Sequence, residues 1–148
     1  NECILFTIIG MITYGFIFIL NHFIIQAAYP DFSFNLIINN MPLALPLFII
    51  VYCFLAPINF VVVFKLLTDK LPIRKNEAAI IVISAIISAI FFTILSYSPT
   101  YDYLFYIRQF IFIFLLSLNC SYLYNQSHSL VCSALSLGFI LLVVNIIH

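Results

Sequence analysis

Residues 78–98, AAIIVISAIISAIFFTILSYS, decide the class of this protein, because they form one long apolar stretch without a charged side chain. A helix needs about 20 such residues to cross the hydrocarbon core of a bilayer. The rest of the chain has the same character: 66% of its 148 residues are hydrophobic, 7% are charged, and the mean hydropathy is +1.25. This composition excludes an ordinary soluble domain and a nucleic-acid-binding protein, and it predicts an integral membrane protein in contact with the lipid bilayer.

The apolar stretches predict an all-α, polytopic transmembrane helical bundle with about five spans. Proline, asparagine and charged residues separate these stretches, and the separating turns after the third and fourth spans are short, which favours antiparallel neighbours. Pro57 removes a backbone donor and is expected to bend the second span. We divide the chain into an N-terminal span with an interfacial loop, residues 1–42, and a four-helix core, residues 43–148. The expected spans cover residues 3–28, 43–68, 78–98, 103–124 and 129–147.

The basic residues predict the orientation of the bundle. Four of them fall at the junction of the second and third expected spans, and an excess of Lys and Arg marks the cytosolic side. By alternation, the start of the first span and the turn at residues 125–129 also face the cytosol. Lys70, Arg74 and Lys75 are interpreted as topology anchors, with a lipid-headgroup site as the alternative. The four residues are Lys65, Lys70, Arg74 and Lys75.

Catalytic and metal-binding patterns are missing from the expected spans. The five carboxylates all lie near span ends, so no two of them are expected to face each other within the membrane as a catalytic pair. No HExxH motif is present. The three histidines do not share one helix face, which argues against a metal site, and no cofactor is expected. The cysteines have no CxxC spacing and are interpreted as small buried hydrophobic residues rather than disulfide partners or metal ligands. They are Cys3, Cys53, Cys120 and Cys132.

Arg108 is a charged residue inside an expected span. It lies about five residues into the fourth span, roughly 8 Å deep, so its side chain can reach back to the interface. An anchor paired with Asp102 is the preferred interpretation, and an intramembrane charge pathway is the alternative. Ser84 and Ser88, one helical turn apart, are interpreted as small residues that allow close helix packing.

Three segments resemble the CAAX prenyl protease and bacteriocin-processing (CPBP, or Abi) family of intramembrane proteins. APINFVVVFKLL, residues 56–67, resembles the first motif, in which a proline precedes two glutamates, an aromatic residue and an arginine. Pro57 and Phe64 fit this pattern. Other residues stand at the glutamate and arginine positions, namely Phe60, Val61 and Lys65.

The second and third motifs are altered in the same way. AAIIVISAIISAIFF, residues 78–92, matches the run around the second motif, but Ser88 and Phe92 stand at its aromatic and histidine positions. YLYNQSHSLVCSALSLGFILL, residues 122–142, is similar to the third-motif segment. There Leu137 and Leu141 replace the histidine and the asparagine.

The resemblance implies a CPBP-like four-helix core that has lost catalysis. In that family the glutamates and histidines are thought to activate a water molecule, and the residues present here offer neither a base nor a ligand. The expected function is therefore that of a pseudoprotease, not an enzyme, which binds, scaffolds or regulates another membrane protein or a transmembrane helix. The expected binding groove is lined by the altered motif positions.

Other functions stay open at this stage. A bacteriocin self-immunity protein would be a version of the same binding role. A small subunit of a larger transport or energy-converting complex would give Arg108 a role as an intramembrane charge. An active intramembrane protease would need residues outside the known motifs. The expected location is the cell membrane, as a multi-pass protein of the bacterial cytoplasmic membrane, with an organelle membrane as the alternative.

Overall fold

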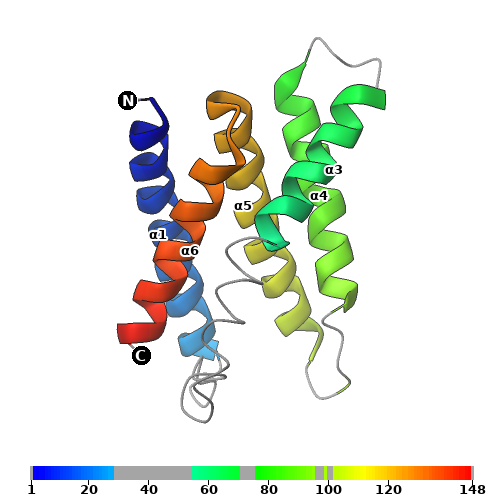
Figure 1. Cartoon of the computed structure of the whole chain (residues 1–148). Coiled ribbons are helices and arrows are strands. Elements are labelled where there is room, and N and C mark those ends of the chain that lie inside the picture. Colours follow the sequence, from blue (N-terminus) through cyan, green and yellow to red (C-terminus); the bar gives the residue numbers. More distant parts are fainter. Residues whose placement is uncertain (1, 29–54, 71–75, 96–98, 100–101, 148) are drawn as a thin grey trace.

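A computed structural model describes residues 2–28, 55–70, 76–95, 99 and 102–147, which contain five helices and no β-strand (Figure 1). The predicted all-α helical bundle is therefore confirmed for the described part of the chain. The helices are α1 (Glu2–Ala28), α3 (Ala56–Lys70), α4 (Glu77–Leu95), α5 (Tyr103–Ser127) and α6 (Leu130–Ile147).

Three segments are long and apolar enough to cross a membrane, namely Glu2–Ile24, Glu77–Leu95 and Tyr103–Ser127. They agree with the first, third and fourth expected spans. The fifth expected span corresponds to α6, in which Leu130–Ile140 forms a shorter apolar stretch. Of the second expected span, α3 gives only the C-terminal part, and residues 43–54 lie outside the described residues. The same holds for the loop at residues 29–42 and for the expected boundary at residue 42.

Local side chains define where the helices begin and end. At the start of α4, the carbonyl oxygen of Asn76 accepts hydrogen bonds from the backbone N–H groups of Ala79 and Ile80. Asp102 caps α5, where its carboxylate accepts the N–H of Phe105 at 3.0 Å. Pro57 lies in the first turn of α3, where a missing N–H costs no intrahelical hydrogen bond. The predicted bend at Pro57 involves residues before Leu55 and stays a prediction.

The turn between α5 and α6 is shorter than predicted. α5 continues to Ser127 instead of residue 124, and α6 begins at Leu130. His128 adopts a left-handed conformation with φ 50°, and its N–H donates to the Tyr124 carbonyl at 2.8 Å, which ends α5. The Ser127 hydroxyl accepts the N–H of Ser129 at 3.2 Å and so closes the turn.

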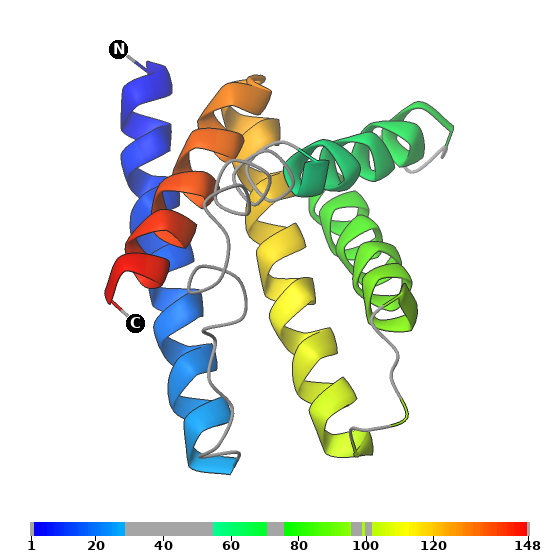
Figure 2. The ribbon, with the colours of Figure 1, turned by 60° about the horizontal axis from the view of Figure 1, so that its bottom comes forward.

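α5 is the central helix of the bundle, because it contacts α1, α3, α4 and α6. α4 and α5 run antiparallel, as do α5 and α6, whereas α1 and α6 lie side by side and run in the same direction (Figure 1). Figure 2 shows α3 inclined across the direction of the other helices. The start of α1, the C-terminal end of α3, the start of α4 and the turn from α5 to α6 all lie at one end of the bundle, the upper end in Figure 1.

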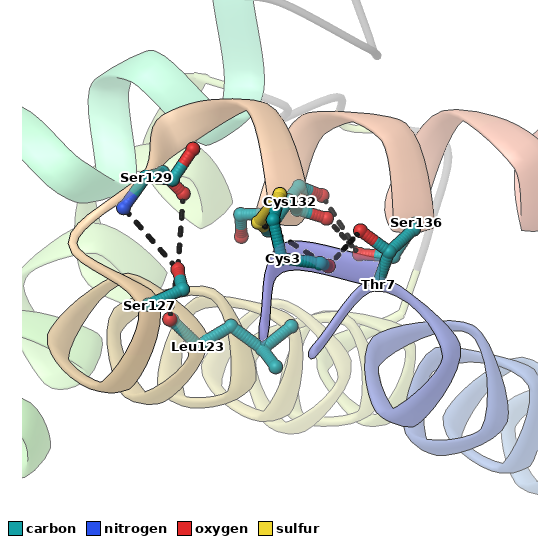
Figure 3. Close-up of a disulfide and its surroundings, with 8 residues drawn as sticks. Cys3, Thr7, Leu123, Ser127, Ser129, Cys132 and Ser136 are labelled. Carbon is teal, nitrogen blue, oxygen red and sulfur yellow. Dashed lines mark hydrogen bonds between the residues drawn. A yellow bond between two sulfur atoms is a disulfide. The ribbon is translucent and has the colours of Figure 1, made fainter. Parts of the chain in front are cut away.

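A disulfide between Cys3 and Cys132 joins the first turns of α1 and α6 (Figure 3). The prediction that these two cysteines are isolated hydrophobic residues is therefore wrong. They are separated by 129 positions in the sequence, but the parallel packing of α1 and α6 brings their Cα atoms within 5.9 Å. Cys120 is a buried free cysteine, as expected, and Cys53 lies outside the described residues.

Candidate functional site

The altered residues of the first motif lie on the inner face of α3. Phe60, Val61 and Phe64 recur at the spacing of one helix face, and each is less than 10% exposed. Lys65 lies on the exposed side of α3, near its C-terminal end. α3 therefore directs its apolar motif positions toward the bundle and its basic residue away from it.

Residues from α4 and α6 meet this face of α3. The ring of Phe92 packs edge to face against Phe60, with 5.5 Å between the ring centroids. Leu137 of α6 is 2% exposed and belongs to the same hydrophobic core as Phe60 and Val61. An aromatic pair of this geometry contributes about 0.5–1.5 kcal/mol beyond its buried area. The four positions thus pack within one hydrophobic core, and the predicted groove stays a prediction.

The remaining predicted site residues lie elsewhere. Ser88 is buried on α4, at the interface with α5. Leu141 belongs to α6, but its side chain is outside the described residues. Arg108 is half-buried in the second turn of α5, and its predicted pairing with Asp102 stays a prediction.

A buried polar cluster at the centre of the same core was missed by the sequence analysis. The Ser133 hydroxyl of α6 lies 3.0 Å from the sulfur of Cys120 and 3.5 Å from the hydroxyl of Tyr14. All three side chains are fully buried, and the Cys120 sulfur lies 3.9 Å from the Pro57 carbonyl oxygen. The cluster joins α1, α3, α5 and α6 at one level of the bundle. A tyrosine within the apolar first span was the one available signal.

Polar side chains also join α5 to α1 and α4. Thr13 of α1 and Asn119 of α5 approach to 2.9 Å between the Thr13 hydroxyl and the Asn119 amide nitrogen. The hydroxyls of Ser84 and Ser121 lie 3.4 Å apart between α4 and α5. One turn further along this antiparallel pair, the buried side chains of Ser88 and Ser117 occupy corresponding positions. The prediction that Ser84 and Ser88 are helix-packing residues agrees with this arrangement.

The described acidic residues lie away from this core. Glu2, Asp69, Glu77 and Asp102 are all exposed and stand at or near helix ends. Within the described ranges, no group of three or more His, Cys, Asp or Glu side chains is placed to hold a metal ion. The described part of this core therefore consists of buried hydroxyl, thiol and apolar groups and holds no carboxylate that could activate water.

No family model, no curated protein and no solved structure matches this chain. The resemblance to the CPBP family therefore stays a prediction that rests on the three segments quoted above.

Proposed function

We propose that this protein is a non-catalytic, multi-pass membrane protein that binds and stabilises another membrane protein. The observation that supports the proposal is the convergence of Phe60, Val61, Phe92 and Leu137 in one closed apolar core. In a CPBP-like core these positions would hold the catalytic groups, and hydrocarbon side chains cannot exchange protons or bind metal. Descent from a CPBP-like protease and residence in a bacterial cytoplasmic membrane belong to the same proposal.

The packing of the core changes the expected route of partner binding. Because Phe60, Val61 and Leu137 are buried, we infer that a partner helix binds on the outer surfaces of the bundle. Only 17–33% of the three candidate spans is buried within the chain, so these helices offer large apolar surfaces to lipid or to another transmembrane helix. Small interface residues and shape would decide such packing, because lipid is as apolar as the partner.

The first test asks whether the purified protein cleaves peptide bonds. The protein in detergent is incubated with prenylated peptides and with transmembrane-helix substrates, with and without divalent metal ions. We expect no cleavage above that of a Phe60→Ala variant, since the proposal assigns no catalytic group. Metal-dependent turnover that persists through a second purification would contradict the proposal.

The second test asks whether a membrane protein accompanies the chain. We expect a stoichiometric partner after purification from native membranes in mild detergent. Phe91 is 56% exposed on α4, whereas its neighbour Phe92 packs against Phe60. Phe91→Ala and Phe92→Ala are the same substitution at neighbouring positions. Phe91→Ala therefore tests partner binding on the outer surface of α4, and Phe92→Ala tests packing in the core. A chain that always purifies alone, in a folded state, would contradict a binding role.

A bacteriocin self-immunity protein is one form of this proposal, in which the partner is the target of the bacteriocin. A small subunit of a larger transport or energy-converting complex is the second candidate function. The half-buried position of Arg108 in α5 favours it, because an intramembrane charge requires an acidic partner or a polar path. Crosslinking of Arg108 to a carboxylate on another chain would favour this second function.

A further inference from the structure

The disulfide between Cys3 and Cys132 lies at the end of the bundle where α1 and α6 begin. Cys3 belongs to the first turn of α1 and Cys132 to the first turn of α6, next to the tight turn of Ser127 and Ser129 (Figure 3). The C-terminal end of α3, with Lys70 in its last turn, lies at the same end of the molecule (Figure 1). The positive-inside bias, applied to the bases between the second and third expected spans, predicts that this end lies in the cytosol.

The cytosol keeps protein thiols reduced, and the disulfides that form there are usually transient, catalytic or regulatory. A disulfide in this position is therefore unlike the permanent disulfides of secreted proteins. The two cysteines also differ in access, since Cys3 is exposed whereas Cys132 is fully buried. A reagent from the aqueous phase meets Cys3 first.

We propose that Cys3 and Cys132 form a reversible, redox-controlled tether between the first turns of α1 and α6. In the oxidation step, the Cys3 thiolate attacks the disulfide of a low-molecular-weight compound or of a thiol–disulfide oxidoreductase and releases one thiolate. The Cys132 thiolate then attacks the Cys3 sulfur and releases the second. The two thiols of the chain thereby lose two protons and two electrons, and the attacked disulfide of the oxidant becomes two thiols.

The start of α1 has little else to hold it on the bundle. Cys3, Ile4, Leu5 and Ile8 are exposed, and Phe6 is the residue of the first two turns that packs against the core. From Gly10 onward the helix is fixed by close approach to Ser136 and by the buried side chain of Tyr14. Reduction therefore releases residues 2–9 and leaves the rest of α1 in place. This inference rests on the predicted orientation and is independent of the proposed function.

The test measures the redox state of each cysteine in intact cells that express the full chain. The cells are quenched with acid, the protein is unfolded, and all free thiols, buried ones included, are alkylated with light N-ethylmaleimide. Disulfides are then reduced, the new thiols are alkylated with the heavy reagent, and peptides are quantified by mass spectrometry. We expect light label on Cys3 and Cys132 in growing cells, heavy label on both after treatment with the thiol oxidant diamide, and light label again after its removal. The buried thiol of Cys120 should stay light throughout.

Two results would overturn the tether. Heavy label on both cysteines in untreated cells would show a permanent structural disulfide, and light label throughout the diamide treatment would show that the bond does not form. The side of the membrane is tested with the Cys132→Ser variant and a membrane-impermeant maleimide. Labelling of Cys3 from outside would place this end in the oxidising compartment and would also overturn the proposal.

Hydrogen exchange tests the structural consequence on the wild-type protein, so that no variant has to fold. Addition of a reductant to the oxidised protein in detergent should accelerate amide exchange in residues 2–9 and leave residues 14–18 unchanged. Equal exchange of residues 2–9 in both states would show that the disulfide does not hold the start of α1.

Discussion

Gly10 and Gly15 of α1 lie in different surroundings, although they are only five positions apart. A Cβ atom at Gly10 would lie 2.6 Å from the Ser136 hydroxyl oxygen, 2.7 Å from the Ser136 Cβ and 2.9 Å from a methyl carbon of Leu123. At Gly15 the nearest such atom is a methyl carbon of Ile140, at an ordinary contact distance of 3.6 Å. Gly10 therefore allows α1 to approach α5 and α6 closely, as small residues do in membrane helices.

We expect Gly10→Ala to destabilise the bundle and Gly15→Ala to leave it unchanged or more stable. The added methyl group at Gly10 has to displace the side chains of Ser136 and Leu123, an overpacking that costs about 1–3 kcal/mol. At Gly15 the substitution gains about 0.5–1 kcal/mol, because alanine loses less conformational entropy in a helix. Thermal unfolding in detergent, compared between the two variants, checks this. Equal melting temperatures would contradict the close approach at Gly10.

Thr13 of α1 and Asn119 of α5 form a hydrogen bond across the interface between these two helices. The Asn119 side chain is 8% exposed, so it has little access to other partners. Interhelical hydrogen bonds in membrane proteins contribute about 0.6 kcal/mol on average and about 1.7 kcal/mol at most. The pair therefore contributes a modest stabilisation to the packing of α1 on α5.

A double-mutant cycle with Thr13→Val and Asn119→Leu should give a coupling energy of about 0.6–1.7 kcal/mol. Each single variant leaves the polar group of the other residue without its hydrogen-bond partner, and the double variant removes both polar groups. The free energy of unfolding of the four proteins is measured in the same detergent. Strictly additive losses would show that these two side chains act independently.

Sequence patterns predicted the helices better than their contacts. Apolar stretches of sufficient length identify α1, α4 and α5, because burial of the backbone in lipid leaves few alternatives to a helix. The end of α5 was predicted too early, because the polar residues 125–127 resemble a loop although they continue the helix to Ser127. The Asn125 amide even donates to Glu77 of α4 at 3.0 Å, a contact that no local pattern indicates.

At the scale of the whole molecule, the ends of the bundle are predicted to lie on opposite sides of the membrane. His128 lies in the turn from α5 to α6, at the end that holds Lys70 and the start of α1 (Figure 1). Pro99 stands between α4 and α5, at the other end. If the basic end is cytosolic, these two exposed positions differ in their access from outside.

We therefore expect an impermeant thiol reagent to label Pro99→Cys and to miss His128→Cys in intact cells. The native cysteines are replaced by serine in both variants, and both positions should react after the membrane is permeabilised. Labelling of His128→Cys in sealed cells would reverse the orientation.

The candidate site was predicted in part. The resemblance selected Phe60, Phe92 and Leu137 from three separate segments, and the structure brings them into one core. The interpretation of these residues as the lining of a groove stays a prediction. The disulfide and the Tyr14 cluster were not predictable, because each depends on which helices are neighbours in space, and α1 and α6 are far apart in sequence.

Crosslinking of Phe60→Cys to Phe92→Cys in native membranes tests the closed core most directly, in a chain whose native cysteines are replaced by serine. The rings of Phe60 and Phe92 are in contact, whereas Val62 on the opposite face of α3 is 48% exposed. A short bifunctional thiosulfonate should therefore crosslink the pair at positions 60 and 92 efficiently, and the matched pair of Val62→Cys with Phe92→Cys only weakly. Equal crosslinking of both pairs, or none at positions 60 and 92, would contradict the packing of the altered motif positions in one core.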